Sequence, residues 1–320
     1  MNWEEMILPI ASSFGITIAF MPLFIGYFQM KKYGQEIRDE GPKWHQVKSG
    51  TPTMGGVVFL VAIIFTSIWV GIWQKAATST LFILLFILAL YGVIGFLDDF
   101  IKIFKKRNMG LNSLQKLIGQ IIGAIVFYLV YLSDGQPNTV NAFGLEIPLS
   151  YAFGLFVVIW LVGFSNAVNL TDGIDGLVAG LGTISFATYG IIAYAQAQYA
   201  ILIVCLSVVG GLIGFFFYNH KPAKIFMGDV GSLALGGLLA TISILLHQEW
   251  TLLLVGLVYV CETASVMLQV ASFKLTGKRI FKMSPIHHHF EMSGWSEWKI
   301  NIVFWLVGLI CSLLTLWIVL

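Results

Sequence analysis

The chain has very few charged residues. Charged residues make up 11% of its 320 residues and hydrophobic residues 58%, whereas soluble domains are about 25% charged. So little polar surface cannot cover a water-soluble globule, and the composition favours an integral membrane protein. It disfavours a disordered chain, a secreted disulfide scaffold and a nucleic-acid-binding protein, so no nucleic-acid partner is expected.

Cysteine is also scarce. The three cysteines, Cys205, Cys261 and Cys311, stand in apolar stretches without a CxxC spacing, which argues against a zinc site and a disulfide framework. The chain has no GxxxxGK[ST] loop, so an ATPase is not expected. Its first residues are acidic where a signal peptide needs a basic region, so the first apolar segment is expected to be retained.

Long apolar runs fill most of the chain. A membrane-spanning helix needs about 20 mostly apolar residues, and ten segments meet this rule: 6–30, 54–73, 80–97, 114–132, 151–168, 177–197, 199–218, 231–246, 252–273 and 300–320. No repeat and no segment large enough for a separate soluble domain interrupts them. We therefore predict an all-α, polytopic fold with one integral-membrane domain over residues 1–320.

The basic residues alternate between the connections. Seventeen of the 18 Lys and Arg residues fall in the first, third, seventh or ninth connection or at its edge, the fifth has none, and only Lys75 falls elsewhere. By the positive-inside rule these odd-numbered connections are cytoplasmic and both termini are extracytoplasmic. An error of one span would destroy the asymmetry, so it supports the count of ten helices as well as the orientation.

Two acidic groups lie in these odd-numbered connections or at their edges. Asp98 and Asp99 stand at the inner end of the third span. Because successive helical residues are about 100° apart, their side chains should contact different partners. Asn169, Asp172 and Asp175 follow one another at three-residue spacing in the fifth connection, and would share one face if it is helical. For the Asp pair, a solvated helix end is the ordinary interpretation, and divalent-metal binding or base work is the functional one. For the second group, an Asp-Gly turn is the ordinary interpretation, whereas the glycine after each Asp would let the backbone approach a ligand closely.

The seventh and ninth connections carry further polar residues. Asp229 stands just before the eighth span, where it could act as an N-cap or work with the nearby Lys221 and Lys224 on a phosphate. His287, His288 and His289 are consecutive, so the evidence for a zinc site is weak. Hydrogen-bond donation from the imidazole N–H groups to phosphate or sugar oxygens is chemically easier.

One acid lies deep within a span. Glu262 shares a helical face with Ser265 and Gln269, and either a structural hydrogen bond or a catalytic role fits it. A secondary transporter, the alternative of a different class, would place its coupling sites at this depth. Most of the acids lie at the inner surface instead, which suits Mg²⁺-assisted phosphoryl transfer involving a membrane lipid.

Five motifs in order resemble one family. They are Lys48–Gly56, Leu97–Phe100, Asn169–Leu177, Phe226–Asp229 and Pro285–Glu291, and they closely resemble those of the phospho-N-acetylmuramoyl-pentapeptide transferases, within the polyprenyl-phosphate sugar-1-phosphate transferase superfamily. The resemblance implies an enzyme of the bacterial plasma membrane that joins UDP-N-acetylmuramoyl-pentapeptide to undecaprenyl phosphate with Mg²⁺, releasing UMP, and it suggests a homodimer. A sister branch using UDP-N-acetylglucosamine would not need the histidine run.

The resemblance also implies which residues act. Asp98, Asp99 and Asp229 match the catalytic acids, with Asp229 as the magnesium ligand. The substrate-binding positions would be Lys48, Thr53, Lys102, Lys116, Asn169, Asp172, Asp175, Asn219, Phe226, Gln269, His287, His288 and His289. We favour direct attack by the lipid phosphate with Asp98 removing any remaining proton; the alternative is a covalent phospho-enzyme on Asp98 or Asp99.

Overall fold

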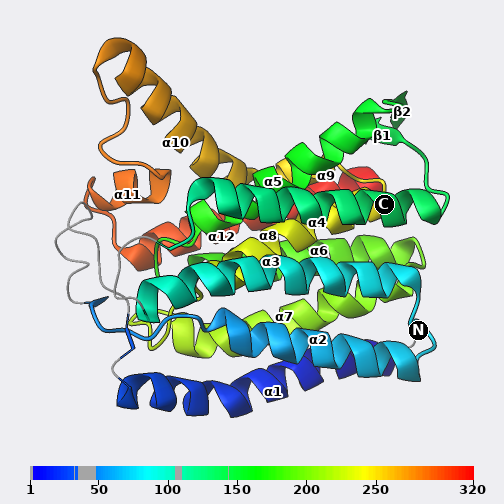
Figure 1. Cartoon of the computed structure of the whole chain (residues 1–320), viewed down its shortest axis with the longest axis horizontal. Coiled ribbons are helices and arrows are strands. Elements are labelled where there is room, and N and C mark those ends of the chain that lie inside the picture. The colour runs from blue at the N-terminus through cyan, green and yellow to red at the C-terminus, as the bar shows by residue number, and fades with distance from the viewer. Residues whose placement is uncertain (1–2, 32, 35–47, 105–109, 143) are drawn as a thin grey trace.

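The computed structural model describes residues 3–31, 33–34, 48–104, 110–142 and 144–320. Long helices lie side by side in one bundle (Figure 1). Their bounds are α1 Trp3–Met30, α2 Gly56–Trp73, α3 Ser79–Phe104, α4 Ser113–Ser133, α5 Ala152–Thr171, α6 Leu177–Ala195, α7 Tyr199–Asn219, α8 Asp229–Leu245, α9 Thr251–Val255, α10 Leu257–Thr276, α11 Ile286–Glu291 and α12 Glu297–Val319. Two strands, β1 Thr139–Ala142 and β2 Leu145–Pro148, form an antiparallel hairpin. The all-α prediction is confirmed.

Eight helices of the described residues are long and apolar enough to cross a membrane, namely α1 to α7 and α12. The other two predicted spans also form helices. α8 is apolar but has 17 residues, and α10 is less apolar because it carries Glu262, Gln269 and Lys274. The predicted ninth span is interrupted at Gly256, whose backbone angles (φ −96°, ψ 17°) separate the short α9 from α10.

The most deeply buried helix is α8, which packs between α3 and α5. Glycine allows the close approach to α3: a Cβ atom on Gly95 would lie 2.2 Å from the carbonyl oxygen of Asp229. In contrast, α10 diverges from the bundle (Figure 1) and exposes the apolar side chains of Met267, Leu268 and Phe273. Exposed apolar surface of this kind is what a lipid environment accommodates.

Both ends of the chain lie at the end of the bundle that carries the β-hairpin, and α11 lies at the opposite end (Figure 1). This arrangement agrees with an even number of crossings. Which end faces the cytoplasm stays a prediction based on the basic residues. Of those residues, Lys32, Arg38, Lys43, Lys105, Lys106 and Arg107 lie outside the described part of the chain.

A buried acid lies near the hairpin. Glu249, between α8 and α9, is 1% exposed, and its Oε2 accepts a hydrogen bond from the backbone N–H of Asn141 at 3.2 Å. Burial raises the pKa of Glu249 to about 7, although this backbone bond opposes the shift. The folded protein therefore holds this proton to higher pH than the unfolded chain does.

This pKa predicts a pH-dependent stability. The favourable contribution of protonated Glu249 is complete below about pH 4.5, the usual value of the group, and is lost as the pH rises to about 7. We expect Glu249→Gln to raise the thermal midpoint at pH 8 by about 2–4 °C and to change it little at pH 4.5. Thermal unfolding of the detergent-purified protein measures this, with the exposed Glu146→Gln on β2 as control. Equal shifts at both pH values would contradict the assignment.

Candidate functional site

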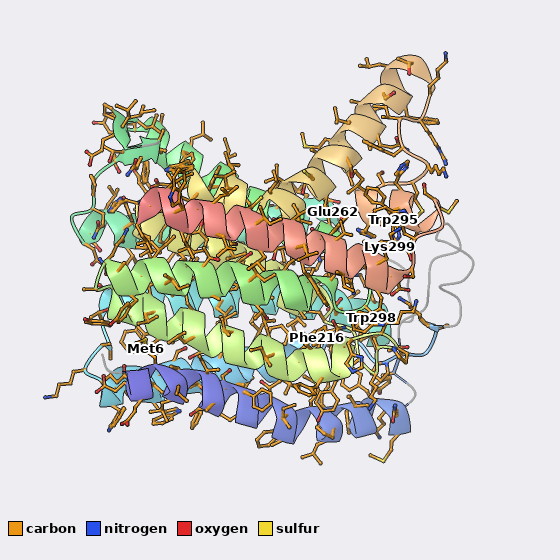
Figure 2. The ribbon with its side chains drawn as sticks, turned by 180° about the vertical axis from the view of Figure 1, so that it is seen from behind. Met6, Phe216, Glu262, Trp295, Trp298 and Lys299 are labelled. Carbon is orange, nitrogen blue, oxygen red and sulfur yellow. The ribbon has the colours of Figure 1, made fainter. Side chains whose placement is uncertain are left out.

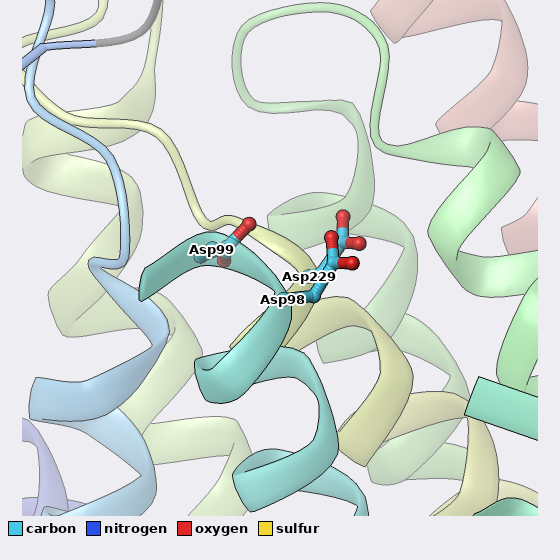
Figure 3. A group of neighbouring side chains, drawn as sticks. All are labelled: Asp98, Asp99 and Asp229. Atoms are coloured by element: carbon cyan, nitrogen blue, oxygen red, sulfur yellow. The ribbon is translucent and has the colours of Figure 1, made fainter. Parts of the chain in front are cut away.

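Three carboxylates meet where the C-terminal end of α3 touches the N-terminal end of α8. Asp98 and Asp99 lie on the last two turns of α3, and Asp229 is the first residue of α8. One ligand oxygen from each lies within 4.8 Å of the others (Figure 3). We call these three residues the acidic cluster. Among the described residues, no other group of three histidine, cysteine or acidic side chains comes this close.

The two adjacent acids of α3 have different backbone partners, as their spacing predicted. Asp98 Oδ1 accepts a hydrogen bond from the N–H of Leu111 at 2.7 Å. Asp99 Oδ2 accepts one from the N–H of Val230 at 3.3 Å, so Asp99 satisfies a free donor at the start of α8. Gly228 occupies the N-cap position of α8. The N-cap interpretation of Asp229 is therefore wrong, and its carboxylate is free for other partners.

Two lysines lie among the three carboxylates. Lys102 Nζ is 2.5 Å from Asp98 Oδ2 and 3.3 Å from Asp229 Oδ2. Lys116 Nζ is 2.7 Å from Asp229 Oδ2 and 3.0 Å from Asp98 Oδ2. Two ammonium groups do not balance three carboxylates, so the site keeps a formal negative charge that favours a further cation.

The donor set fits a hard divalent cation. Mg²⁺ prefers one or two carboxylates together with water and phosphate oxygens. Asp229 is the most accessible of the three acids, because its side chain is 18% exposed against 1% for Asp98 and 6% for Asp99. Its Oδ1 accepts a hydrogen bond from Asn169 Nδ2 at 3.0 Å. Asp229 would therefore hold the cation, beside the two lysine ammonium groups that contact its Oδ2.

The connection between α5 and α6 spreads its polar residues over separate partners. α5 ends at Thr171, so the helical face proposed for Asn169, Asp172 and Asp175 does not continue past the first of them. Burial, followed by the negative charges of Asp229, Asp99 and Asp175, raises the pKa of Asp172 to about 8. Asp172 therefore favours its protonated form near neutral pH.

A second group of charged residues surrounds Asp175. We call Lys48, Asp175, Lys221 and Glu297 the Lys48 cluster. Lys48 Nζ lies 2.7 Å from Asp175 Oδ1 and 2.9 Å from Glu297 Oε2, and Lys221 pairs with Glu297 Oε1. Burial lowers the pKa of the Lys48 ammonium, but the charges of Glu297 and Asp175 outweigh burial and raise it. Lys48 is thus held protonated.

Backbone hydrogen bonds hold the neighbouring loops together. Asn219 Oδ1 accepts from the N–H of Gly176 at 3.0 Å, and its Nδ2 donates to the carbonyl of Ile225 at 2.9 Å. The N–H of Phe226 donates to the carbonyl of Pro52 at 2.8 Å. Thr53, next to Pro52, is buried. The predicted residues Thr53, Asn219 and Phe226 therefore lie where three connections meet.

The three histidines of α11 do not share a partner. His287 Nδ1 lies 3.1 Å from Glu262 Oε2, with both side chains fully buried. His288 Nδ1 lies 2.7 Å from Glu291 Oε2, and His289 Nδ1 accepts from the N–H of Lys282 at 3.1 Å. This arrangement disfavours the zinc alternative, and it gives Glu262 the structural pairing that the sequence left open.

Gln269 faces the backbone of the loop that follows α10. Its Oε1 accepts from the N–H groups of Ile280 and Phe281, both at 2.9 Å. The α11 segment nevertheless packs closely against the α5–α6 connection, because a Cβ atom on Gly173 would lie 2.2 Å from His287 Nε2. The last turn of α5 therefore touches the acidic cluster through Asn169, and the connection that follows it touches the Lys48 cluster through Asp175 and α11 at Gly173.

Sequence reasoning missed Glu297. It follows Ser296, whose side chain caps α12 by accepting from the N–H of Lys299, so in the sequence it reads as an ordinary acid in a first helical turn. Its 2% exposed side chain and its two lysine partners appear only in the folded chain. The one available signal was an acid at the start of a span in a basic connection.

The comparisons with known proteins agree with this geometry. The glycosyl transferase family 4 model matches residues 81–247, and the phospho-N-acetylmuramoyl-pentapeptide-transferase signature 1 matches residues 48–60. Proteins with that enzyme's name from Enterococcus hirae and Enterococcus faecalis are 77% and 72% identical, over 100% and 99% of both chains. One from Latilactobacillus sakei is 64% identical over 96% of this chain and 97% of its own. The chain therefore belongs to the phospho-N-acetylmuramoyl-pentapeptide-transferase family, within glycosyl transferase family 4.

Proposed function

We propose that this chain transfers phospho-N-acetylmuramoyl-pentapeptide from its UDP-linked donor to undecaprenyl phosphate in the bacterial plasma membrane, releasing UMP. Its relatives carry the name of this activity. The observation that carries the site assignment is the acidic cluster with Lys102 and Lys116 at one end of a bundle of apolar helices. A site at that position can meet a water-soluble nucleotide sugar and a lipid phosphate together. The distribution of basic residues supports placing it on the cytoplasmic face.

The charges of the cluster suit a reaction between phosphates. Asp229 would hold Mg²⁺, which when bound supplies positive charge against the phosphate oxygens. Lys102 and Lys116 add further positive charge where the transition state becomes more negative. Lys48, held by Asp175 and Glu297, would bind the donor in the neighbouring cluster.

The contacts of Asp98 favour the one-step route. In that route an acceptor phosphate oxygen bonds to the sugar-bearing phosphorus while the bond from that phosphorus to UMP breaks. A phosphate monoester is mostly ionised at neutral pH, its second pKa being about 6, so little proton removal is needed. Asp98 has its Oδ1 on the N–H of Leu111 and its Oδ2 beside two ammonium groups, which weakens it as a nucleophile. Removal of a remaining proton by Asp98 stays a prediction.

The test is UMP release by the detergent-purified protein. We expect release that requires undecaprenyl phosphate, Mg²⁺ and the muramoyl-pentapeptide donor together. Turnover of UDP-N-acetylglucosamine instead would assign the protein to the sister branch, and no release from either donor would reopen the transporter alternative. Labelled sugar-phosphate trapped on the protein without lipid acceptor would overturn the one-step route. The homodimer that the resemblance suggests stays a prediction.

A further inference from the structure

Glu297 connects three separate segments of the chain. Its Oε2 lies 2.9 Å from Lys48 Nζ and accepts a longer bond, 3.4 Å, from the backbone N–H of Asp175. Its Oε1 pairs with Lys221. These partners precede α2, follow α5 and follow α7, while Glu297 itself begins α12. One carboxylate therefore fixes the relative position of three connections.

The charges explain why this carboxylate can be buried. Burying a carboxylate is costly unless it is paired and hydrogen-bonded. Glu297 and Asp175 are 2% and 3% exposed, and Lys48 is 16% exposed. Two carboxylates and two ammonium groups make the Lys48 cluster neutral overall. Removing the charge of Glu297 would leave Lys221 without this partner and Lys48 with Asp175 alone.

The last turn of α5 and the connection that follows it link the Lys48 cluster to the acidic cluster. Asp175 lies six residues after Asn169, whose side chain bonds Asp229 at 3.0 Å and Ser232 at 2.9 Å. Asn301, four residues after Glu297 on α12, donates to the carbonyl of Asp175 at 2.7 Å. Two side chains in the first turns of α12 thus hold the α5–α6 connection, Glu297 at the backbone N–H of Asp175 and Asn301 at its carbonyl. Movement of Glu297 would shift Lys48 and this connection together.

We propose that Glu297 is a positioning residue for the nucleotide-sugar donor, acting through the Lys48 ammonium and the 172–176 connection. The inference rests on the proposed function, in which Lys48 binds the donor. None of the hydrogen bonds described for Glu297 reaches the acidic cluster. Loss of the Glu297 carboxylate should therefore weaken donor binding more than it slows the chemical step. The lipid acceptor should be affected little.

The experiment compares Glu297→Gln with Glu297→Asp. For each variant, KM for the UDP donor, KM for undecaprenyl phosphate and kcat are measured in the same detergent, and UMP binding is measured by calorimetry. Glu297→Gln should raise the donor KM about tenfold and weaken UMP binding in parallel, with kcat and lipid KM changing less than about threefold. Glu297→Asp keeps the charge and should recover part of the loss.

Two control variants match the change. Lys299→Gln lies in the same turn of α12, where its ammonium rests over the Trp295 ring at 4.2 Å, and Glu146→Gln makes the same substitution on the exposed β2. Both should keep the donor KM of the unmodified protein. These controls separate loss of the Lys48 contact from a general disturbance of α12.

Several results would overturn the inference. For Glu297→Gln these results are an unchanged or lower donor KM, an equal rise in the KM for donor and for lipid, or a fall in kcat alone. If that variant does not fold, a donor KM in Glu297→Asp equal to that of the unmodified protein decides against the inference, and a raised one with unchanged lipid KM supports it. Absence of UMP release from the unmodified protein would instead reject the proposed function.

Discussion

Replacing Asp229 with asparagine is expected to lower the rate of UMP release by about 10²–10³-fold. Asp229 Oδ2 lies near both Lys116 and Lys102, and its Oδ1 accepts from Asn169. Asparagine has nearly the same shape, but it loses the negative charge and can place an NH₂ group towards the ammonium groups. The cluster would then lose the carboxylate proposed to hold the metal, which is also the shared partner of both lysines.

The measurement is UMP release at saturating substrates over a range of Mg²⁺ concentrations. Asp134→Asn is the matched control, because Asp134 is exposed after α4 and accepts from the Ser79 hydroxyl at 2.7 Å. Both variants should remain folded in detergent. Near-normal release with an unchanged Mg²⁺ dependence in Asp229→Asn would remove Asp229 from the metal site.

Replacing Gly228 with alanine should lower UMP release by about 100-fold. Gly228 has φ 77° and ψ 168°, a conformation that is essentially restricted to glycine and costs other residues about 1–3 kcal/mol. An added Cβ atom would also lie 2.4 Å from Asp99 Oδ2 and 3.1 Å from the backbone nitrogen of Met54. Asp99 would have to move, and a displacement of about 1 Å in a catalytic group can cost about 10²-fold in rate.

The control for Gly228→Ala is Gly135→Ala. Gly135 also has a positive φ, 71°, but has no atom within 4 Å of a Cβ position. It should show a modest loss of stability and normal activity. UMP release and the thermal midpoint are measured for both variants. Equal activity in Gly228→Ala and the unmodified protein would show that Asp99 does not need its present position.

The sequence predicted the helices and most of the candidate residues because the bilayer imposes simple rules. A spanning segment needs about 20 apolar residues and must satisfy its own backbone hydrogen bonds, so all ten predicted spans are helical, although the ninth is divided into α9 and α10. Acids are costly near lipid, so Asp98, Asp99 and Asp229 could be identified without any structure. The boundary at Gly256 was missed because one backbone break does not change the hydropathy of the surrounding segment.

The grouping of these residues depended on the tertiary structure. Asp98 and Asp229 are 131 positions apart, and Lys48 and Glu297 are 249 apart, so no local spacing could pair them. Glycines such as Gly95 decide how closely the helices approach, and that approach brings Asp229 to α3. The sequence by itself determined which groups had to remain at the ends of apolar helices, because burial of unpaired charge in lipid is too costly. Only the packing of the helices decided which charge neutralises which, because ion pairs form between whatever side chains the folded chain brings within a few ångströms.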